Sequence, residues 1–129
     1  MLPALHVFEY AVLRVVPRVE REEFVNVGVV LLCRAQGFLQ CRCAVPAARV
    51  SALAGPQFDF EELHGRLAAF GQICRGQPEG GLIGSLGLAE RFRWLTATRS
   101  TVLQTSPVHP GLCAGAGATL ARLFEELVA

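Results

Sequence analysis

Glu23-Phe-Val-Asn-Val-Gly-Val-Val-Leu-Leu-Cys33 is the stretch of this sequence that decides the fold. Every residue from Val27 to Cys33 is apolar or Gly, and valine, which favours strands, recurs through the run. The run is too short to span a membrane, which takes about 20 apolar residues. It has the length of a strand that is covered on both faces, although its periodicity alone also fits a segment of buried helix.

Two residues of this stretch do not suit a plain buried strand. Asn26 carries an amide that needs hydrogen-bond partners if it is buried. Gly28 weakens a strand unless a bulge or the close approach of a neighbouring group requires it. We therefore expect Asn26 to bind neighbouring backbone or Arg14, and Gly28 to admit a neighbouring group.

Strand-like segments flank the central stretch on both sides. Residues 9–16 end at Pro17, and their alternation places Ala11, Leu13 and Val15 on one face and Arg14 on the other. Residues 38–45 follow a turn and are expected to form a hairpin with the central stretch. If Gln36 and Gly37 are the two turn residues, Val30 lies opposite Cys43 and Leu32 opposite Cys41, with Gln40 and Arg42 on the other face.

The rest of the chain alternates between helical patterns and loops. Residues 58–75 are the clearest helix, because apolar residues recur at helical spacing, and Asp59 and Gly76 suit its two ends. Shorter helices are expected at 46–53, 88–95 and 118–128, a fourth strand at 100–108, and loops at 77–87 and 111–117. Consecutive strands with short connections pair antiparallel. The sequence predicts an α+β fold, a mostly antiparallel sheet of about four strands covered by two or three helices.

Length and composition limit the classes of function. The chain has 129 residues, which fits a single domain over 1–129. A formal net charge of +1 gives no general attraction for nucleic acid or an anionic membrane. An apolar composition with so little net charge favours association, so we expect a protein partner or a homodimer. Five cysteines and no signal peptide predict a reducing cytoplasm with free thiols.

Known catalytic and metal-binding patterns are missing from the sequence. Cys41-x-Cys43 has only Cys33 nearby, which is too few ligands at suitable spacing for zinc, so we expect no metal and no cofactor. The only aspartate is Asp59, which helix capping explains, and no Ser–His–Asp arrangement can be argued. General acid–base catalysis therefore has little support.

Several segments together resemble a known family. These are Tyr10-Ala-Val-Leu-Arg-Val-Val-Pro17, Phe24-Val-Asn-Val-Gly-Val-Val-Leu31, the Arg91–Ser100 segment followed by Gln104-x-Ser106, and Leu123-Phe-Glu-Glu-Leu-Val128. They are similar to the bacterial domain-of-unknown-function family 3037. The resemblance implies a small bacterial protein without an assigned activity, and a kinase-like protein as a candidate partner. An acidic residue that the resemblance implies at the start of the last helix is absent here, where Gly115-Ala-Gly117 stands.

Residues 91–106 are the most polar cluster in the sequence. Between Arg91 and Phe124 there is no acidic residue, while arginines, hydroxyl groups and amides are closely spaced. Such a set can hold a phosphate or carboxylate through charge-assisted hydrogen bonds, and Trp94 can stack on a ligand. The competing interpretation is a helix end with solvated polar groups, where cations are favoured. The predicted binding residues are Arg99, Ser100, Gln104, Arg93, Arg91, Asn26 and Arg14.

Two functional hypotheses follow. The first is a non-catalytic protein- or anion-binding module that uses the Arg91–Ser106 face. The second is a small enzyme acting on a phosphorylated or nucleotide substrate, with Arg14, Asn26 and the same cluster. The shortage of acids, bases and nucleophiles favours the first. A closed pocket that joined Arg14, Asn26 and Arg99 with a glutamate would favour the second.

Overall fold

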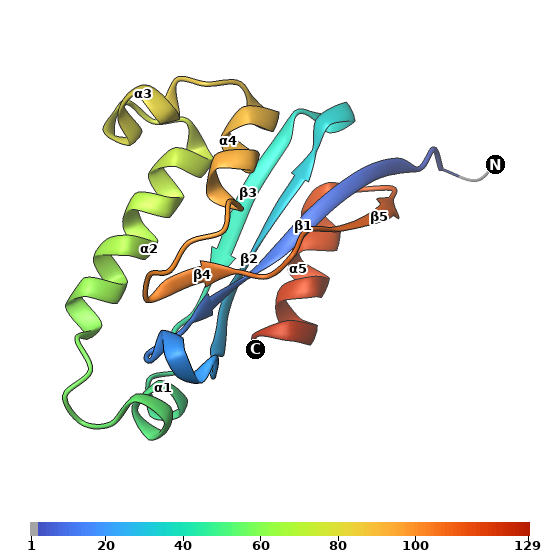
Figure 1. Cartoon of the computed structure of the whole chain (residues 1–129). Coiled ribbons are helices and arrows are strands. Elements are labelled where there is room, and N and C mark those ends of the chain that lie inside the picture. Colours follow the sequence, from blue (N-terminus) through green and yellow to red (C-terminus); the bar gives the residue numbers. More distant parts are fainter. Residues whose placement is uncertain (1–2) are drawn as a thin grey trace.

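The computed structural model describes residues 3–129 and has an α+β fold (Figure 1). Met1 and Leu2, which belong to the segment on which the expectation about a signal peptide rests, lie outside the described residues. The sheet contains β1 (His6–Val15), β2 (Val25–Cys33), β3 (Phe38–Cys43), β4 (Leu103–Thr105) and β5 (His109–Cys113). Its order is β3-β2-β1, and β4 and β5 pair with successive parts of the remaining edge of β1. Each of these pairings is antiparallel.

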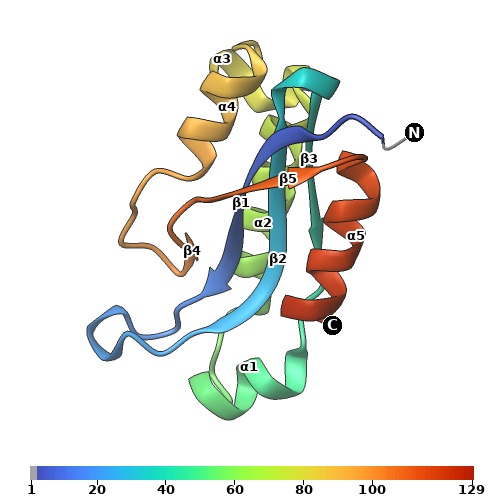
Figure 2. The same ribbon diagram turned by 90° about the vertical axis from the view of Figure 1, so that its right-hand side faces the viewer.

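The helices cover both faces of the sheet. Figure 1 and Figure 2 show α2 (Phe60–Arg75) and α4 (Leu88–Leu95) on one face and α5 (Ala116–Leu127) on the other. The connections contain α1 (Ala47–Ala54), the one-turn helix α3 (Gly81–Gly84) and three short 3-10 turns. Among the described residues, no helix has both the length and the apolar composition that a membrane span requires.

Because the sheet is covered on both faces, the molecule has two hydrophobic cores. The larger core lies between the sheet and helices α1, α2 and α4, and the smaller core lies between the sheet and α5. From Val27 to Cys33, β2 is buried without interruption and contributes side chains to both cores. This confirms the expected two-sided burial of the central stretch. On β1, Ala11, Leu13 and Val15 share the larger core, as their alternation predicts.

A β-bulge in β2 explains why Asn26 lies where it does. Leu13 pairs with Gly28, but the next residue, Arg14, pairs with Asn26, so Val27 is an extra residue on β2. Strict alternation would place Asn26 on the same face as Val30, in the larger core. The bulge instead turns Asn26 toward the face that α5 covers.

Gly28 lies beside the bulge and admits Cys43 of the neighbouring strand. A Cβ atom at this position would lie 2.8 Å from Cys43 Sγ and 3.0 Å from the Arg42 carbonyl oxygen. The expectation that Gly28 admits a neighbouring group is therefore confirmed. The pairing of Gly28 with Cys43 also corrects the hairpin register.

The predicted hairpin register is wrong by two residues. Val30 pairs with Cys41 rather than Cys43, and Leu32 pairs with Leu39. The physical reason is the connection, which is a 3-10 turn over Arg34–Gln36 ending at Gly37 with φ 59°, not a two-residue turn. A shift of two residues preserves the faces, so Arg42 does lie on the α5 side, where it stacks over Phe124.

The segment after residue 100 also differs from its prediction. In place of one strand at 100–108, β4 and β5 are two short strands, and β5 occupies part of the predicted loop at 111–117. Ser106 lies between them and continues the ladder, because its N–H donates to Val12 O and its Oγ accepts from Val12 N–H. Pro110, which lacks an N–H, lies within β5 on the edge of the sheet.

Side chains from elsewhere in the chain cap both ends of α5. At its start, Gly115 has no side chain to act as a cap, and Gln36 supplies one. Gln36 Oε1 accepts from Ala116 N–H at 2.9 Å, and its Nε2 donates to Ala114 O at 2.9 Å. The β2–β3 connection therefore takes the place of a local N-cap.

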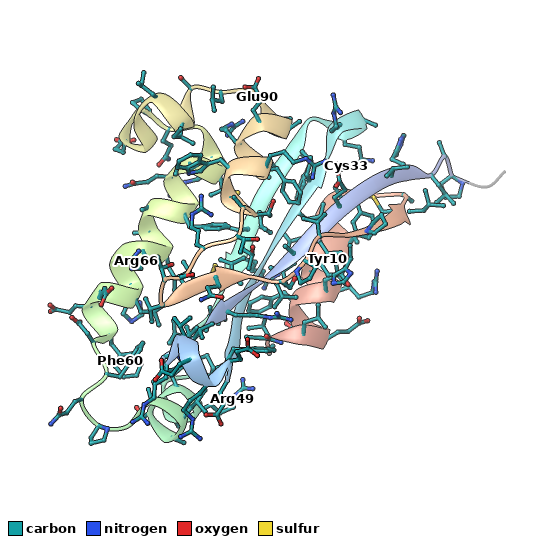
Figure 3. The ribbon with its side chains drawn as sticks, in the orientation of Figure 1. Tyr10, Cys33, Arg49, Phe60, Arg66 and Glu90 are labelled. Atoms are coloured by element: carbon teal, nitrogen blue, oxygen red, sulfur yellow. The ribbon has the colours of Figure 1, made fainter. Side chains whose placement is uncertain are left out.

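The far end of α5 meets Asn26 and α1. Asn26 Nδ2 donates to Leu127 O at 3.1 Å, and Arg49 Nη2 donates to Val128 O at 3.2 Å (Figure 3 labels Arg49). The expectation that Asn26 binds backbone is confirmed. Although Arg14 lies directly opposite, it does not share a hydrogen bond with Asn26 among the described residues, where Asn26 Oδ1 and Arg14 Nε are buried without partners.

Candidate functional site

Arg91 is buried and binds the chain's own backbone. Its guanidinium donates to Ile73 O at 3.1 Å, Cys74 O at 2.9 Å and Leu86 O at 2.9 Å, which closes the C-terminal end of α2. Gly76, which ends α2 with φ 70°, leaves the room for it, since a Cβ there would lie 2.7 Å from Arg91 Nη1. With its side chain committed in this way, Arg91 is a structural residue, and the structure does not place it in a binding site.

Arg93 is paired within the molecule. Two parallel hydrogen bonds of 2.9 and 2.8 Å join its guanidinium to the Glu9 carboxylate on β1. The hydrogen bond to Glu9 raises the pKa of Arg93; desolvation opposes this, and the charge of Glu9 acts in the same direction as the hydrogen bond. The pair fixes α4 to the sheet and leaves Arg93 neutralised by a local carboxylate.

Arg99 caps the C-terminal end of α4. Its guanidinium donates to Trp94 O, to Leu95 O at 3.3 Å and to Ala97 O at 3.2 Å, and it stacks over the Trp94 ring with 5.2 Å from Cζ to the ring centroid. A guanidinium has five N–H donors, so two remain after these three contacts. Within residues 3–129, no carboxylate forms a salt bridge with Arg99. Arg99 is therefore both a structural cap and a source of unpaired donors.

A cavity opens beside Arg99, between α2, the end of α4 and β4. Its volume is about 180 Å³, and no acidic residue is among the residues that line it. Trp94, which is 46% exposed, forms part of its wall, and Arg66 of α2 faces the same space (Figure 3 labels Arg66). The lining residues are Arg66, Ala69, Phe70, Ile73, Trp94, Leu95, Ala97, Arg99, Thr101, Leu103, Gln104 and Thr105. We call this space the Trp94 pocket.

The structure brings only two of the predicted binding residues into the Trp94 pocket. Arg99 and Gln104 line the Trp94 pocket, whereas Ser100, Arg91, Arg93, Asn26 and Arg14 are not among its lining residues. Arg14 pairs in register with Asn26 on one side and Gln104 on the other, so these three residues form a row across β2, β1 and β4. Gln104 belongs both to this row and to the lining of the Trp94 pocket, whereas Arg14 and Asn26 do not line the pocket. The Arg14 guanidinium stacks over the Phe24 ring, with 4.0 Å from Cζ to the ring centroid. Burial lowers the pKa of Arg14.

Sequence reasoning missed Arg66 as a member of the site. Arg66 lies in the middle of α2, where its ion pair with Glu62 at 3.1 Å follows from i,i+4 spacing. Nothing in that spacing indicates that α2 packs beside β4, about 40 residues later in the chain. The polar, arginine-rich segment did indicate three lining residues of the pocket, Trp94, Arg99 and Gln104.

Cysteine and histidine side chains do not form a metal centre in the described part of the chain. Among residues 3–129, no group of three or more histidine, cysteine, aspartate or glutamate side chains is arranged to hold a metal ion. All five cysteines are free thiols. Cys33 and Cys113 lie in the smaller core, and Cys74 lies in the larger core with Cys41 packed against it.

Comparison with known proteins places the chain in a family. The family model described as a protein of unknown function, DUF3037, matches residues 10–128. The chain belongs to this family. The matched part of this DUF3037 protein contains all of its arginines and the whole Trp94 pocket, whereas Glu9, the partner of Arg93, lies just before it. No curated protein and no solved structure matches the chain.

Proposed function

We propose that this DUF3037 protein is a non-catalytic protein- or anion-binding module and that the Trp94 pocket is its binding site. The occupant is an anionic group, a carboxylate or a phosphate, attached to a small apolar or aromatic body. The body would lie against Trp94 and Phe70, and the anionic group would face Arg99 and Arg66. The same chemistry fits a small ligand or an acidic side chain of a partner.

The observation that carries this proposal is the charge of the pocket. Two arginines line a space of about 180 Å³ that has no lining carboxylate. Arg66 has a partner, but Glu62 is an exposed residue of the same helix, and exposed pairs contribute only about 0–1 kcal/mol. Arg99 retains two unused N–H donors. A bound anion would gain charge-assisted hydrogen bonds without breaking a buried ion pair.

The alternative, a small enzyme acting on a phosphorylated or nucleotide substrate, has less support. Such a site needs a group that can transfer a proton or attack the substrate. The Trp94 pocket offers arginines, threonines, a glutamine and a tryptophan, but no lining histidine, cysteine or carboxylate. Arg14 and Asn26, which the enzyme hypothesis requires, are not among the residues that line the pocket. The geometry therefore supports binding better than catalysis.

Trp94 makes the proposal testable, because it is the only tryptophan in the chain. Its intrinsic fluorescence therefore reports on this pocket alone. Phenyl phosphate and benzoate, titrated against the purified protein, should change the emission in a saturable manner, and neutral benzyl alcohol should bind more weakly. Replacing Arg99 by Gln should weaken binding by about 1.5–3 kcal/mol, the amount expected for a lost hydrogen bond to a charged group.

Two further variants control for the structural role of Arg99. Arg66→Gln removes a pocket cation that caps no helix, so it should weaken binding of both anions while the circular dichroism spectrum stays unchanged. Arg122→Gln removes an exposed arginine of α5 that pairs only with Glu126, and binding should be unaffected. Unchanged emission with both anions up to millimolar concentrations, or equal affinities in all three variants, would contradict the proposal.

The setting of the protein is part of the same proposal. We propose a bacterial cytoplasmic protein, on the grounds of five cysteines that are all free and of the family resemblance. A protein partner, with a kinase-like protein as a candidate, would present an acidic side chain to the Trp94 pocket. A homodimer is the competing assembly, and sedimentation of the isolated protein distinguishes the two.

A further inference from the structure

Three cysteine side chains meet where β3 packs against α2. Cys41 and Cys43, two residues apart on β3, share one face of the strand, and Cys74 lies in the last turn of α2. Cys41 and Cys43 line one hollow at this junction together with Arg75, and Cys41 and Cys74 line a second hollow together with Arg75 and Arg91. This thiol cluster is separate from the Trp94 pocket, whose lining contains no cysteine.

The surroundings of Cys41 favour a negative charge on its sulfur. Hydrogen bonds from Cys43 and then Cys74 hold the pKa of Cys41 well below its usual range, and the Arg75 guanidinium acts in the same direction against desolvation. Donation to Cys41 raises the pKa values of Cys43 and Cys74, and burial raises them further. The other ionisable groups near the cluster are His64 of α2 and Arg91 of α4, and neither is acidic.

Cys41 is also accessible to small molecules. It is half-buried and lines two adjoining hollows, one with His64 and Arg75 and the other with Gln40 and Arg91. Cys74, by contrast, is only 1% exposed. Reactive cysteines are typically those that combine partial exposure with a stabilised thiolate. Cys41 combines both, whereas exposure alone would single out Cys43.

We propose that Cys41 is the reactive thiol of this chain and that hydroperoxides oxidise it to a sulfenic acid. The thiolate sulfur attacks one peroxide oxygen, so that an S–O bond forms as the O–O bond breaks. The sulfur loses two electrons to the peroxide. The attacked oxygen keeps its own hydrogen, so the cysteine becomes the sulfenic acid Cys–SOH directly, and the departing hydroxide or alkoxide takes one proton from the solvent. Cys43 and Cys74 can then donate to the new oxygen.

A peptide map of the intact protein tests this proposal directly. The reduced chain is treated with hydrogen peroxide at pH 6 in the presence of dimedone, which traps sulfenic acids, and is then digested with trypsin. Cleavage after Arg42 separates Cys41 from Cys43, and the remaining three cysteines fall in three other peptides. Dimedone should appear first on Cys41, because an ordinary cysteine has little thiolate at this pH. A sulfenic acid on Cys41 can also condense with the thiol of Cys43 or Cys74, so a disulfide between Cys41 and one of these two cysteines supports the proposal as well.

Variants then test the role of the cluster. Cys43→Ala and Cys74→Ala each remove a donor to Cys41, so labelling of Cys41 at pH 6 should slow by about tenfold or more. Cys113→Ala, in the smaller core, should leave the rate unchanged. First labelling of Cys43, equal labelling of all five cysteines, or an unchanged rate in both cluster variants would overturn the proposal. The wild-type map decides the site even if a variant fails to fold.

Discussion

At the scale of single residues, arginines in this protein serve the ends of helices. Arg91 closes α2, Arg99 closes α4 and Arg49 reaches the end of α5, each by donating to backbone carbonyl oxygens. The last carbonyls of a helix lack intrahelical partners and carry a partial negative charge, which a guanidinium satisfies with several donors at once. An arginine-rich segment without acids therefore need not be a binding surface, and of these three arginines only Arg99 lines the Trp94 pocket.

The first prediction concerns Arg91. Arg91→Ala removes the side-chain donor to Ile73 O, Cys74 O and Leu86 O, so it should destabilise the protein by about 2–4 kcal/mol. Of these three oxygens, Ile73 O keeps the N–H of Gly76 as a donor. Urea denaturation followed by circular dichroism measures this as a lower midpoint. The matched control is Arg122→Ala, an exposed residue of α5 whose loss should cost less than about 0.5 kcal/mol. Equal midpoints for the two variants would show that Arg91 is not a structural cap.

At the scale of elements, β2 and its connection to β3 position the last helix. Gln36 follows β2 and binds the start of α5, and Asn26 near the beginning of β2 binds its end. The helix therefore runs antiparallel to β2, with a polar anchor at each end of the smaller core. The bulge at Val27 makes this arrangement work, because without it Asn26 would lie on the opposite face of the sheet.

The second prediction follows from the cap that Gln36 provides. Gln36→Ala should destabilise the protein by about 1 kcal/mol, the usual cost of losing an N-cap, and should speed amide exchange at Ala116. A side chain that caps α5 from position 115 should restore the lost stability. Gly115 has extended backbone with φ −137°, and a Cβ there would meet nothing within 4 Å, so Gly115→Ser has room. If Gly115→Ser stabilises the wild type and the Gln36→Ala variant equally, Gln36 is not the cap.

Elements were predictable from the sequence where their own residues determine them. The alternation in β1 and the helical spacing in α2 are local patterns, and both elements were predicted within a few residues. The segment His109-Pro-Gly-Leu-Cys113 lacks any such pattern, and it forms a strand because it pairs with the edge of β1. The same limit applied to the site. The carbonyl oxygens that accept from Arg91 lie on α2, and Arg66 of α2 lines the same pocket as Gln104 of β4. Both arrangements depend on how distant elements pack.

At the scale of the whole molecule, one sheet with a core on each face concentrates stability in its centre. β1 and β2 are paired on both edges along most of their length and covered on both faces, whereas residues 77–87 form short helical turns with few buried side chains. Local opening is easiest where few apolar contacts must break. Both proposed sites lie on the α2 side of the sheet, so α5 and the smaller core have a structural role.

The third prediction is a gradient of hydrogen exchange. Amides of Val27–Cys33 should exchange only through global unfolding, with protection that tracks the free energy of unfolding, and amides in 77–87 should exchange through local opening. Exchange measured by NMR at several urea concentrations separates the two routes, since only global opening depends strongly on denaturant. Strong denaturant dependence in 77–87, or weak dependence in β2, would contradict this distribution.

The position of β1 in the sheet has a consequence for biosynthesis. β1 is translated before the other strands of its sheet, and the edge it offers to β4 and β5 stays empty until Cys113 has been added. At about 5–20 residues per second, the ribosome takes roughly 5–20 s to reach that residue. During this interval a valine-rich strand has an open edge, and the face of β2 that α5 will cover is bare. We therefore expect the nascent chain to bind chaperones that recognise exposed apolar strands.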